Sequence, residues 1–203
     1  MKKIIISVLV IAAVVGIGIF LLKNNDKNSD SNSSNSSTNT ADVTPSNDLA
    51  PAPKGDELKA NLKTAGLDAL SAEGTVLHIH QHLDIVINGK AVGVPMNLGI
   101  GTDFISPLHV HDDSGVVHVE SPVQKDFTLG QLFTEWGVPL TDTCVSTYCN
   151  DDTHKLVVAV NGQAIIGKPQ DLVLKAHDEI EIWYGDKTLV PEFIKSYTFP
   201  EGE

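Results

Sequence analysis

The sequence contains no arginine, and its fourteen basic residues are all lysines. Arginine is the side chain best suited to bidentate recognition of phosphate groups. The 26 acidic residues outnumber the lysines and give a formal net charge of -12. Because such a surface repels polyanions, we expect no nucleic-acid partner. It attracts cations, which is compatible with metal binding but is also typical of many secreted proteins.

The N-terminal apolar block lacks a cleavage pattern of small residues at its end. Residues 4–22 contain one polar member, Ser7, and as a helix they are long enough to cross a hydrocarbon core of about 30 Å. The preceding Lys2 and Lys3 favour a cytoplasmic N-terminus. We therefore expect residues 1–23 to form an uncleaved single-pass anchor in the cell membrane, with a cleaved signal peptide as the alternative.

The next segment has almost nothing to bury. Residues 24–54 are dominated by Asn, Ser, Asp, Thr and Pro, as in SDSNSSNSSTNT. This composition predicts a disordered tether. Residues 55–203 have the length of one ordinary domain, which the anchor would place outside the cytoplasm.

The chain has only two cysteines, Cys144 and Cys149, within TDTCVSTYCNDDTH. In an oxidising compartment this pair is expected to form a disulfide. The spacing differs from the Cys-x-x-Cys of thiol oxidoreductases, which disfavours redox catalysis. A second metal site formed by both cysteines and His154 is a weaker alternative.

The folded part begins with leucines at helical spacing over residues 56–70 and then changes to a period of two. Asn88-Gly89 within LDIVINGKAVGVP predicts a hairpin of 76–87 with 90–94. The segment PLHVHDDSGVVHVES predicts two short strands around a turn at 112–115. Thr128 is expected to cap the helix LGQLFTEWG.

The segments LVVAVNGQAIIG and DEIEIWYG predict a second Asn-Gly hairpin and a final strand. The expected fold class is α+β, with a single mixed sheet and one or two helices. KLVVAVNGQAII and LVLKAHDEIEIWYG resemble the closing strands of ubiquitin-like sulfur carriers, which have the β-grasp fold. This resemblance covers residues 155–185 and implies a β-grasp-like fold. The chain lacks the terminal Gly-Gly of those carriers, so their activity is not implied.

Histidines alternate along the first predicted strand, VLHIHQHLDIV. His78, His80, His82 and Asp84 occupy every second position, so their side chains leave one face of the strand. Neighbours two apart are separated by about 6.6 Å, which is close enough for two imidazoles to bind one ion. His80 belongs to both possible pairs.

A second group follows in PLHVHDDSGVVHVES. His109 and His111 alternate, and His118 lies across the turn. A two-residue loop at 113–114 or 114–115 would place His118 opposite one of them, whereas a three-residue loop would turn it to the other face. Glu120 shares the face of His118 and could orient an imidazole.

Three motifs, HIHQHLDIVINGK, PLHVHDDSGVVHVES and TLGQLFTEWG, look like those of a family of small membrane-anchored extracytoplasmic proteins of bacteria and archaea with no established activity. The resemblance implies that His80, His82, His109, His111, Asp112 and His118 belong to recurring motifs, with His78 beside them.

The paired histidines predict binding of a transition-metal ion, zinc or copper, which the sequence does not distinguish. One alternative is a metal-dependent hydrolase or lyase with a three-histidine site, and another is a β-grasp interaction module with structural histidines. His154 and His177 stand apart and are expected to be structural. The candidate metal ligands are His78, His80, His82, His109, His111 and His118, and the supporting carboxylates are Asp84, Asp112 and Glu120.

Overall fold

A computed structural model of the chain describes residues 49–189 and 191–202. The predicted anchor and most of the predicted tether lie outside these residues. Within the described part, the structure contains no helix with the length and apolar character needed to cross a membrane.

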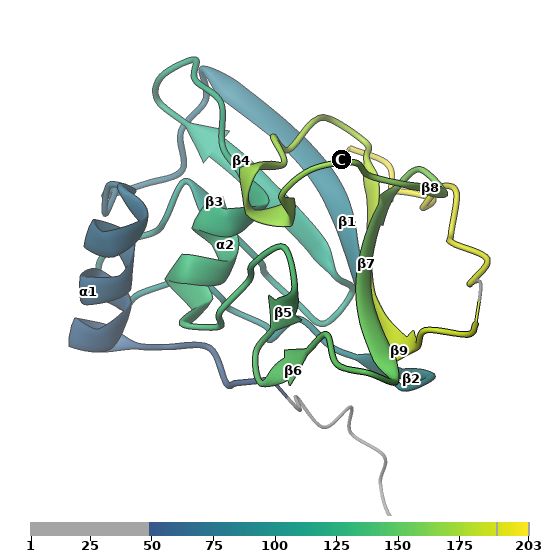
Figure 1. Ribbon diagram of the computed structural model, residues 1–203. Coiled ribbons are helices and arrows are strands. Elements are labelled where there is room, and N and C mark those ends of the chain that lie inside the picture. Colours follow the sequence, from purple (N-terminus) through teal and green to yellow (C-terminus); the bar gives the residue numbers. More distant parts are fainter. Residues whose placement is uncertain (1–48, 190, 203) are drawn as a thin grey trace, which may run out of the picture. The chain divides into compact units, whose positions relative to one another are not determined.

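The domain consists of one large mixed sheet, a small hairpin and two α-helices (Figure 1). The strands of the large sheet follow the order β3-β4-β1-β9-β7-β8, and β2 pairs with β1. β1 and β9 are parallel, while the other pairs are antiparallel. The predicted α+β class with a mixed sheet is therefore confirmed. The elements are α1 (Gly55–Ala65), β1 (Leu77–Ile87), β2 (Lys90–Val92), β3 (Leu108–His109), β4 (Val116–Ser121), α2 (Leu129–Trp136), β5 (Cys144–Val145), β6 (Tyr148–Cys149), β7 (His154–Val160), β8 (Gln163–Ala164), the 3-10 helix η1 (Pro169–Asp171) and β9 (Glu179–Asp186).

Both predicted Asn-Gly hairpins are present. Asn88 and Gly89 join β1 to β2 with φ angles of 51° and 77°, and Asn161 and Gly162 join β7 to β8 with 52° and 79°. Two central residues with positive φ are what a two-residue type I′ turn requires. These turns fix the register of their strands.

The helices end at left-handed glycines. The Thr128 side chain accepts a hydrogen bond from Gln131 N, and the Gln131 side chain accepts one from Thr128 N, so α2 begins with a capping box and ends at Gly137. The predicted helix over 56–70 is too long, because α1 ends at Ala65. Gly66 follows with φ 67° and closes the last turn.

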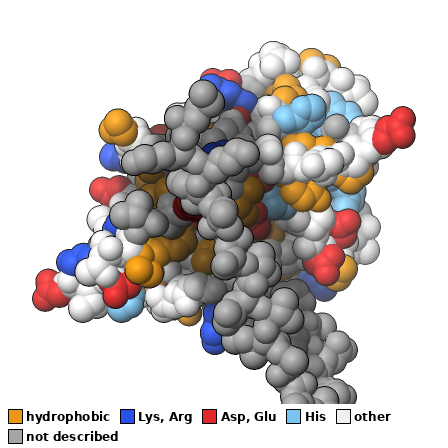
Figure 2. All heavy atoms as spheres, turned by 90° about the vertical axis from the view of Figure 1, so that its right-hand side faces the viewer, with side chains coloured by type: hydrophobic (Ala, Val, Ile, Leu, Met, Phe, Trp, Pro, Cys, Tyr) orange, Lys and Arg blue, Asp and Glu red, His pale blue; other side chains and the backbone are white. Residues whose placement is uncertain are grey.

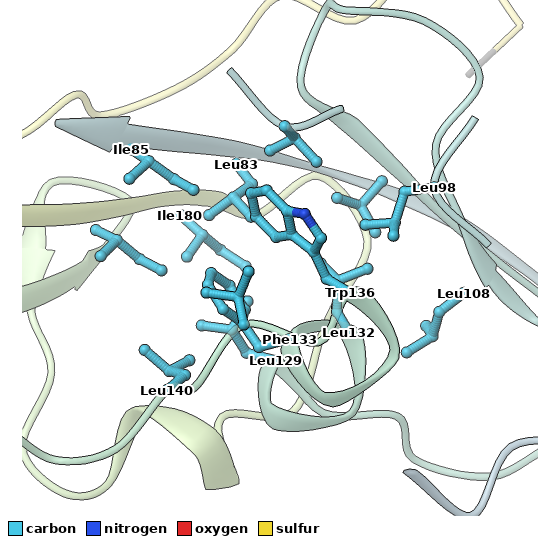
Figure 3. Close-up of a cluster of buried hydrophobic side chains, with 14 of the residues drawn as sticks. Leu83, Ile85, Leu98, Leu108, Leu129, Leu132, Phe133, Trp136, Leu140 and Ile180 are labelled. Carbon is cyan, nitrogen blue, oxygen red and sulfur yellow. The ribbon is translucent and has the colours of Figure 1, made fainter. Parts of the chain in front are cut away.

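The hydrophobic core lies between α2 and the sheet. Figure 3 shows Leu132, Phe133 and Trp136 of α2 gathered with Leu83 and Ile85 of β1. Both helices lie on one side of the sheet (Figure 1). Because side chains alternate along a strand, the even-numbered residues of β1 and β4 project from the opposite face. That face carries the histidines.

The C-terminal segment, residues 191–200, also lies on the histidine face. Ile194 N donates a hydrogen bond to the Glu181 carboxylate (2.9 Å), and the Tyr197 ring stacks on His82 at 3.8 Å between ring centroids. The segment contains no strand or helix.

The predicted disulfide is confirmed. Cys144 and Cys149 are bonded and face each other across the β5–β6 hairpin. The hairpin is tied to the main sheet by a hydrogen bond from the Tyr184 hydroxyl to the Cys149 carbonyl oxygen (3.0 Å).

Candidate metal centre

Three histidines form a row across three neighbouring strands. In the register of β1, β4 and β3, His80 lies opposite His118, and His118 lies opposite His109. Directly opposed residues of antiparallel strands project to the same side. The rings of His80 and His118 are 4.4 Å apart between centroids, and those of His109 and His118 are 5.1 Å apart. The β3–β4 register is the one expected for a turn centred on residues 113–114.

Two further histidines extend the row toward solvent. The Nε2 atoms of His78 and His80 are 3.2 Å apart. The His111 ring is 4.6 Å from the His118 ring between centroids. The His78 and His111 side chains are 52% and 45% exposed, whereas His109 is fully buried. Figure 2 shows histidine side chains reaching the surface on the side that lies to the right in Figure 1. The cluster therefore has two edges open to solvent and a buried centre.

The Glu120 carboxylate lies among four of these rings. Its Oε1 atom is 3.2 Å from His118 Nδ1, 3.3 Å from His78 Nε2, and 4.0 Å from both His80 Nε2 and His109 Nε2. Its position in the sequence predicted that Glu120 supports an imidazole from outside the ligand set. The distances instead make its oxygen a candidate ligand in its own right.

Glu73 is a member of the cluster that the sequence analysis missed. Its Oε1 atom is 3.7 Å from His111 Nε2 and 3.9 Å from His109 Nε2. The following residue, Gly74, packs so closely against the Ser121 backbone that a Cβ atom would clash with it. Glycine at this position lets the chain approach β4 and so brings Glu73 to the histidines. In the sequence, the Glu-Gly dipeptide before β1 was the only feature that pointed to this close contact.

The carboxylates of Glu73 and Glu120 repel each other within the cluster. Burial raises the pKa of Glu120, and the negative charge of Glu73 raises it further, while nearby histidines act in the opposite direction. Glu120 is 5% exposed. A cation at this position would relieve the repulsion between Glu73 and Glu120.

His109 presents an unpaired nitrogen to the cluster. Its Nδ1 atom donates a hydrogen bond to the Ser106 carbonyl oxygen (3.0 Å). Its Nε2 atom is buried and has no hydrogen-bond partner among the described residues. Burial lowers the pKa of His109 to about 3, and the charges of neighbouring histidines such as His118 and His111 contribute. The ring is therefore neutral at pH 7, with its lone pair on Nε2.

Two buried hydrogen bonds fix the position of Ser106, whose carbonyl oxygen in turn orients the His109 ring. The Ser106 hydroxyl donates to the Glu135 carboxyl group (2.7 Å) and accepts a hydrogen bond from Leu108 N (3.1 Å). Burial raises the pKa of Glu135 to about 8, although the bond from Ser106 lowers it. Glu135 is thus mainly a neutral acid at pH 7. Ser106 and Glu135 were not predicted from the sequence, because nothing in the pattern of α2 distinguishes a buried glutamate from a solvent-facing one.

The structure places His82 in a separate group with Asp84 and Glu179. His82 Nδ1 is 2.9 Å from Glu179 Oε2 and 3.6 Å from Asp84 Oδ2, and His82 Nε2 is 2.8 Å from the Ser114 carbonyl oxygen. Burial alone would lower the pKa of His82, but the hydrogen bond and charge of Glu179 help to raise it overall. Both ring nitrogens of His82 are thus engaged by protein oxygens, unlike those of His109.

The remaining candidates lie apart from the cluster. Asp112 is exposed, and its carboxylate accepts a hydrogen bond from Ser114 N (2.9 Å), so it closes the turn between the two histidine motifs. The His154 ring stacks on Tyr184, and the His177 ring lies against Phe199. Neither His154 nor His177 belongs to a group of possible metal ligands in the described part of the chain.

The described residues thus include several groups that could hold a metal ion. In each group the ligand atoms lie within 4.8 Å of one another. Comparison with known proteins gave no match to any family model, curated protein or solved structure. The functional inference therefore rests on the histidine and carboxylate groups themselves. Three groups lie in the cluster, and they are His109, His111 and His118, then His78, His80 and Glu120, and finally Glu73, His109 and Glu120.

The separate position of His82 leads to a prediction. The variant His82→Ala should lose about 3 kcal/mol of stability at pH 6.5, because it leaves the buried Glu179 without its partner. Its metal content should equal that of the wild type. Chemical denaturation and elemental analysis measure the two quantities, and a loss of bound metal without a loss of stability would contradict this assignment.

The same pair also predicts a pH dependence. Because the folded pKa of His82 is raised above its unfolded value, its contribution is complete below about pH 6.5 and is lost as the pH rises through the folded pKa. In chelator, the wild type should therefore lose more stability between pH 6.5 and 8 than a His82→Ala/Glu179→Gln variant that lacks both titrating partners, as chemical denaturation at each pH would show.

Proposed function

We propose that this chain binds a transition-metal ion, zinc or copper, on the open face of its sheet. The single observation that carries the proposal is the buried, unpaired Nε2 of His109, directed into a cluster of other imidazoles and carboxylates. The proposed ligands are drawn from His78, His80, His109, His111, His118, Glu73 and Glu120.

The environment of His109 has the features of a metal ligand. Leaving a buried acceptor without a partner costs about 1–3 kcal/mol, and a bound cation would offset this cost. The bond from Nδ1 to the Ser106 carbonyl oxygen fixes the tautomer and the orientation of the ring, as is usual for metal-binding histidines. Its low pKa keeps the ring neutral, which coordination requires.

A purely structural role for the histidines explains this arrangement less well. A ring used only for packing or hydrogen bonding would be expected to pair both of its nitrogens, as His82 does with Glu179 and Ser114. His109 pairs one nitrogen and directs the other toward Glu73 and Glu120. The contrast between the two rings favours metal binding in the cluster over an interaction module.

We further propose that the domain lies outside the cytoplasm, tethered to the cell membrane by residues 1–23 through the Asn- and Ser-rich segment that follows them. The apolar run at 4–22 and the Cys144–Cys149 disulfide support this location. A β-grasp-like fold is supported by the central parallel pair β1–β9, with the β7–β8 hairpin beside it and α2 between β4 and β7 in the chain.

A second candidate function is that of a metal-dependent hydrolase or lyase with a three-histidine site. It is favoured by the half-exposed His111 and Glu73, which leave one side of the cluster open to water. A catalytic zinc needs such an open coordination position. This function predicts turnover that chelation abolishes and re-metallation restores. A site closed by four protein ligands would count against it.

Elemental analysis tests the metal-binding proposal. The full-length chain, purified in mild detergent without added metal, should carry zinc or copper or take it up on incubation, and should retain at least one equivalent after gel filtration. The matched control His154→Gln should retain the same amount. Less than a tenth of an equivalent of any transition metal under both conditions would contradict the proposal.

A further inference from the structure

We infer that the cluster holds two metal ions, bridged by Glu120. This inference rests on the proposed function and deepens it. One ion would lie over β1 with His78 and His80, and the other near the end of β3 with His109, His111 and His118. Glu120 lies between the two sets of ligands.

The number of donors exceeds what one ion uses. Zinc or copper bound by imidazole and carboxylate is usually four-coordinate and sometimes five-coordinate. The cluster offers five imidazoles and two carboxylates. The set His109, His111 and His118 shares no residue with the set His78, His80 and Glu120, and each is compact enough to surround an ion.

The positions of the two sets on the sheet favour two centres. β4 lies between β1 and β3, so the backbones of His80 on β1 and His109 on β3 are about 9–10 Å apart, and His118 and Glu120 on β4 lie between them. Donor atoms bound to one zinc ion lie at most about 4.2 Å apart, because each bond is about 2.1 Å long. The rings follow one another from His78 through His80 and His118 to His111 at centroid separations of 4.9, 4.4 and 4.6 Å, which is a longer row than one ion spans. The two exposed rings, His78 and His111, extend the cluster at its opposite ends. One ion would leave at least one of these ends without metal.

Glu120 has the position that a bridge requires. Its Oε1 atom is 3.3 Å from His78 Nε2 in one set and 3.2 Å from His118 Nδ1 in the other. A carboxylate placed between two sets of ligands can bridge two ions, which usually lie about 3.5–4 Å apart in two-metal sites. Glu73, beside His109 and His111, adds a carboxylate to the second ion only. Each ion thereby obtains both imidazole and carboxylate ligands.

The two exposed histidines allow each centre to be removed separately. His78→Ala and His111→Ala change side chains that are about half exposed, so the variants should fold normally. Metal-free full-length chain is titrated with copper(II), and the copper retained after gel filtration is measured. The wild type and a His154→Ala control should bind two equivalents, each single variant one, and the His78→Ala/His111→Ala double variant less than half an equivalent.

Electron paramagnetic resonance then tests the bridge. Two copper(II) ions within about 4 Å of each other interact magnetically, so the wild-type spectrum should be broadened or weakened relative to its copper content, with a half-field signal. Each single variant should give the spectrum of an isolated ion at full intensity. Glu120→Gln should retain imidazole ligands but lose the interaction.

The outcomes separate the two proposals. One equivalent in the wild type would overturn the two-ion inference and leave metal binding intact, whereas no bound copper or zinc would overturn both. Two equivalents with uncoupled spectra would contradict the Glu120 bridge. Two equivalents in both folded single variants would contradict the assigned positions.

Discussion

Replacing His109 with glutamine is expected to weaken metal binding by at least about 100-fold. Loss of a residue that only orients a ligand typically costs 10–100-fold in affinity, and loss of a ligand should cost more. Among the proposed ligands, His109 has the best-fixed geometry, because the Ser106 carbonyl oxygen accepts a hydrogen bond from its Nδ1 atom and the ring is fully buried. Competition with a chelator of known affinity measures the effect.

Two controls accompany this variant. His154→Gln makes the same chemical change at a histidine outside the cluster and should bind metal as tightly as the wild type. Ser106→Ala keeps the carbonyl that accepts from His109 Nδ1, but removes the hydroxyl that Glu135 and Leu108 contact, so its loss should be smaller. A folded His109→Gln protein with an affinity within threefold of the wild type would exclude His109 as a ligand.

Removal of the metal is expected to lower the free energy of unfolding by about 4 kcal/mol when free metal exceeds the dissociation constant a thousandfold. A ligand that binds only the folded state stabilises it by this linkage. The effect should be concentrated at the histidine face, because the proposed ligands come from the three neighbouring strands β1, β4 and β3. Denaturation curves with zinc and with chelator give the difference.

The matching control is the double variant His78→Ala/His111→Ala. It should show a much smaller difference between zinc and chelator, because both proposed centres have lost a ligand. Equal stability of the wild type under the two conditions would favour the interaction module with structural histidines.

Local features of the fold were predictable from sequence because their causes are local. Asn-Gly pairs specify two-residue turns, and Thr128 with Gln131 specifies the start of α2. The alternation of histidines with apolar residues placed His78, His80 and His118 on the outer face of their strands. The end of α1 was misplaced because the leucine spacing continues past Gly66, whose left-handed conformation stops the helix.

The composition of the candidate site depends on contacts between distant segments, which the sequence pattern does not contain. His82 shares a face with His80 on β1 but lies opposite Glu179 of the parallel strand β9, 97 residues away in the chain. It therefore pairs with that carboxylate. Glu73 enters the cluster through the close packing of Gly74 on β4. Neither contact has a local signature.

Glu135 illustrates a second limit of prediction from the sequence. It lies on the buried side of α2 beside Leu132 and Trp136, where a charged residue is rarely found without a partner. Its bond with Ser106 is what makes the position tolerable, and that partner is 29 residues away. Sequence periodicity identifies the helix but not this role.

X-ray absorption spectroscopy of the zinc-loaded full-length protein tests the central claim most directly. Imidazole and carboxylate ligation predicts nitrogen and oxygen neighbours at about 2.0–2.1 Å, together with the outer-shell scattering of at least two histidine rings per zinc ion. This scattering should decrease in His109→Gln. A shell of oxygen atoms without imidazole scattering would show that the metal binds elsewhere and would contradict the proposed site.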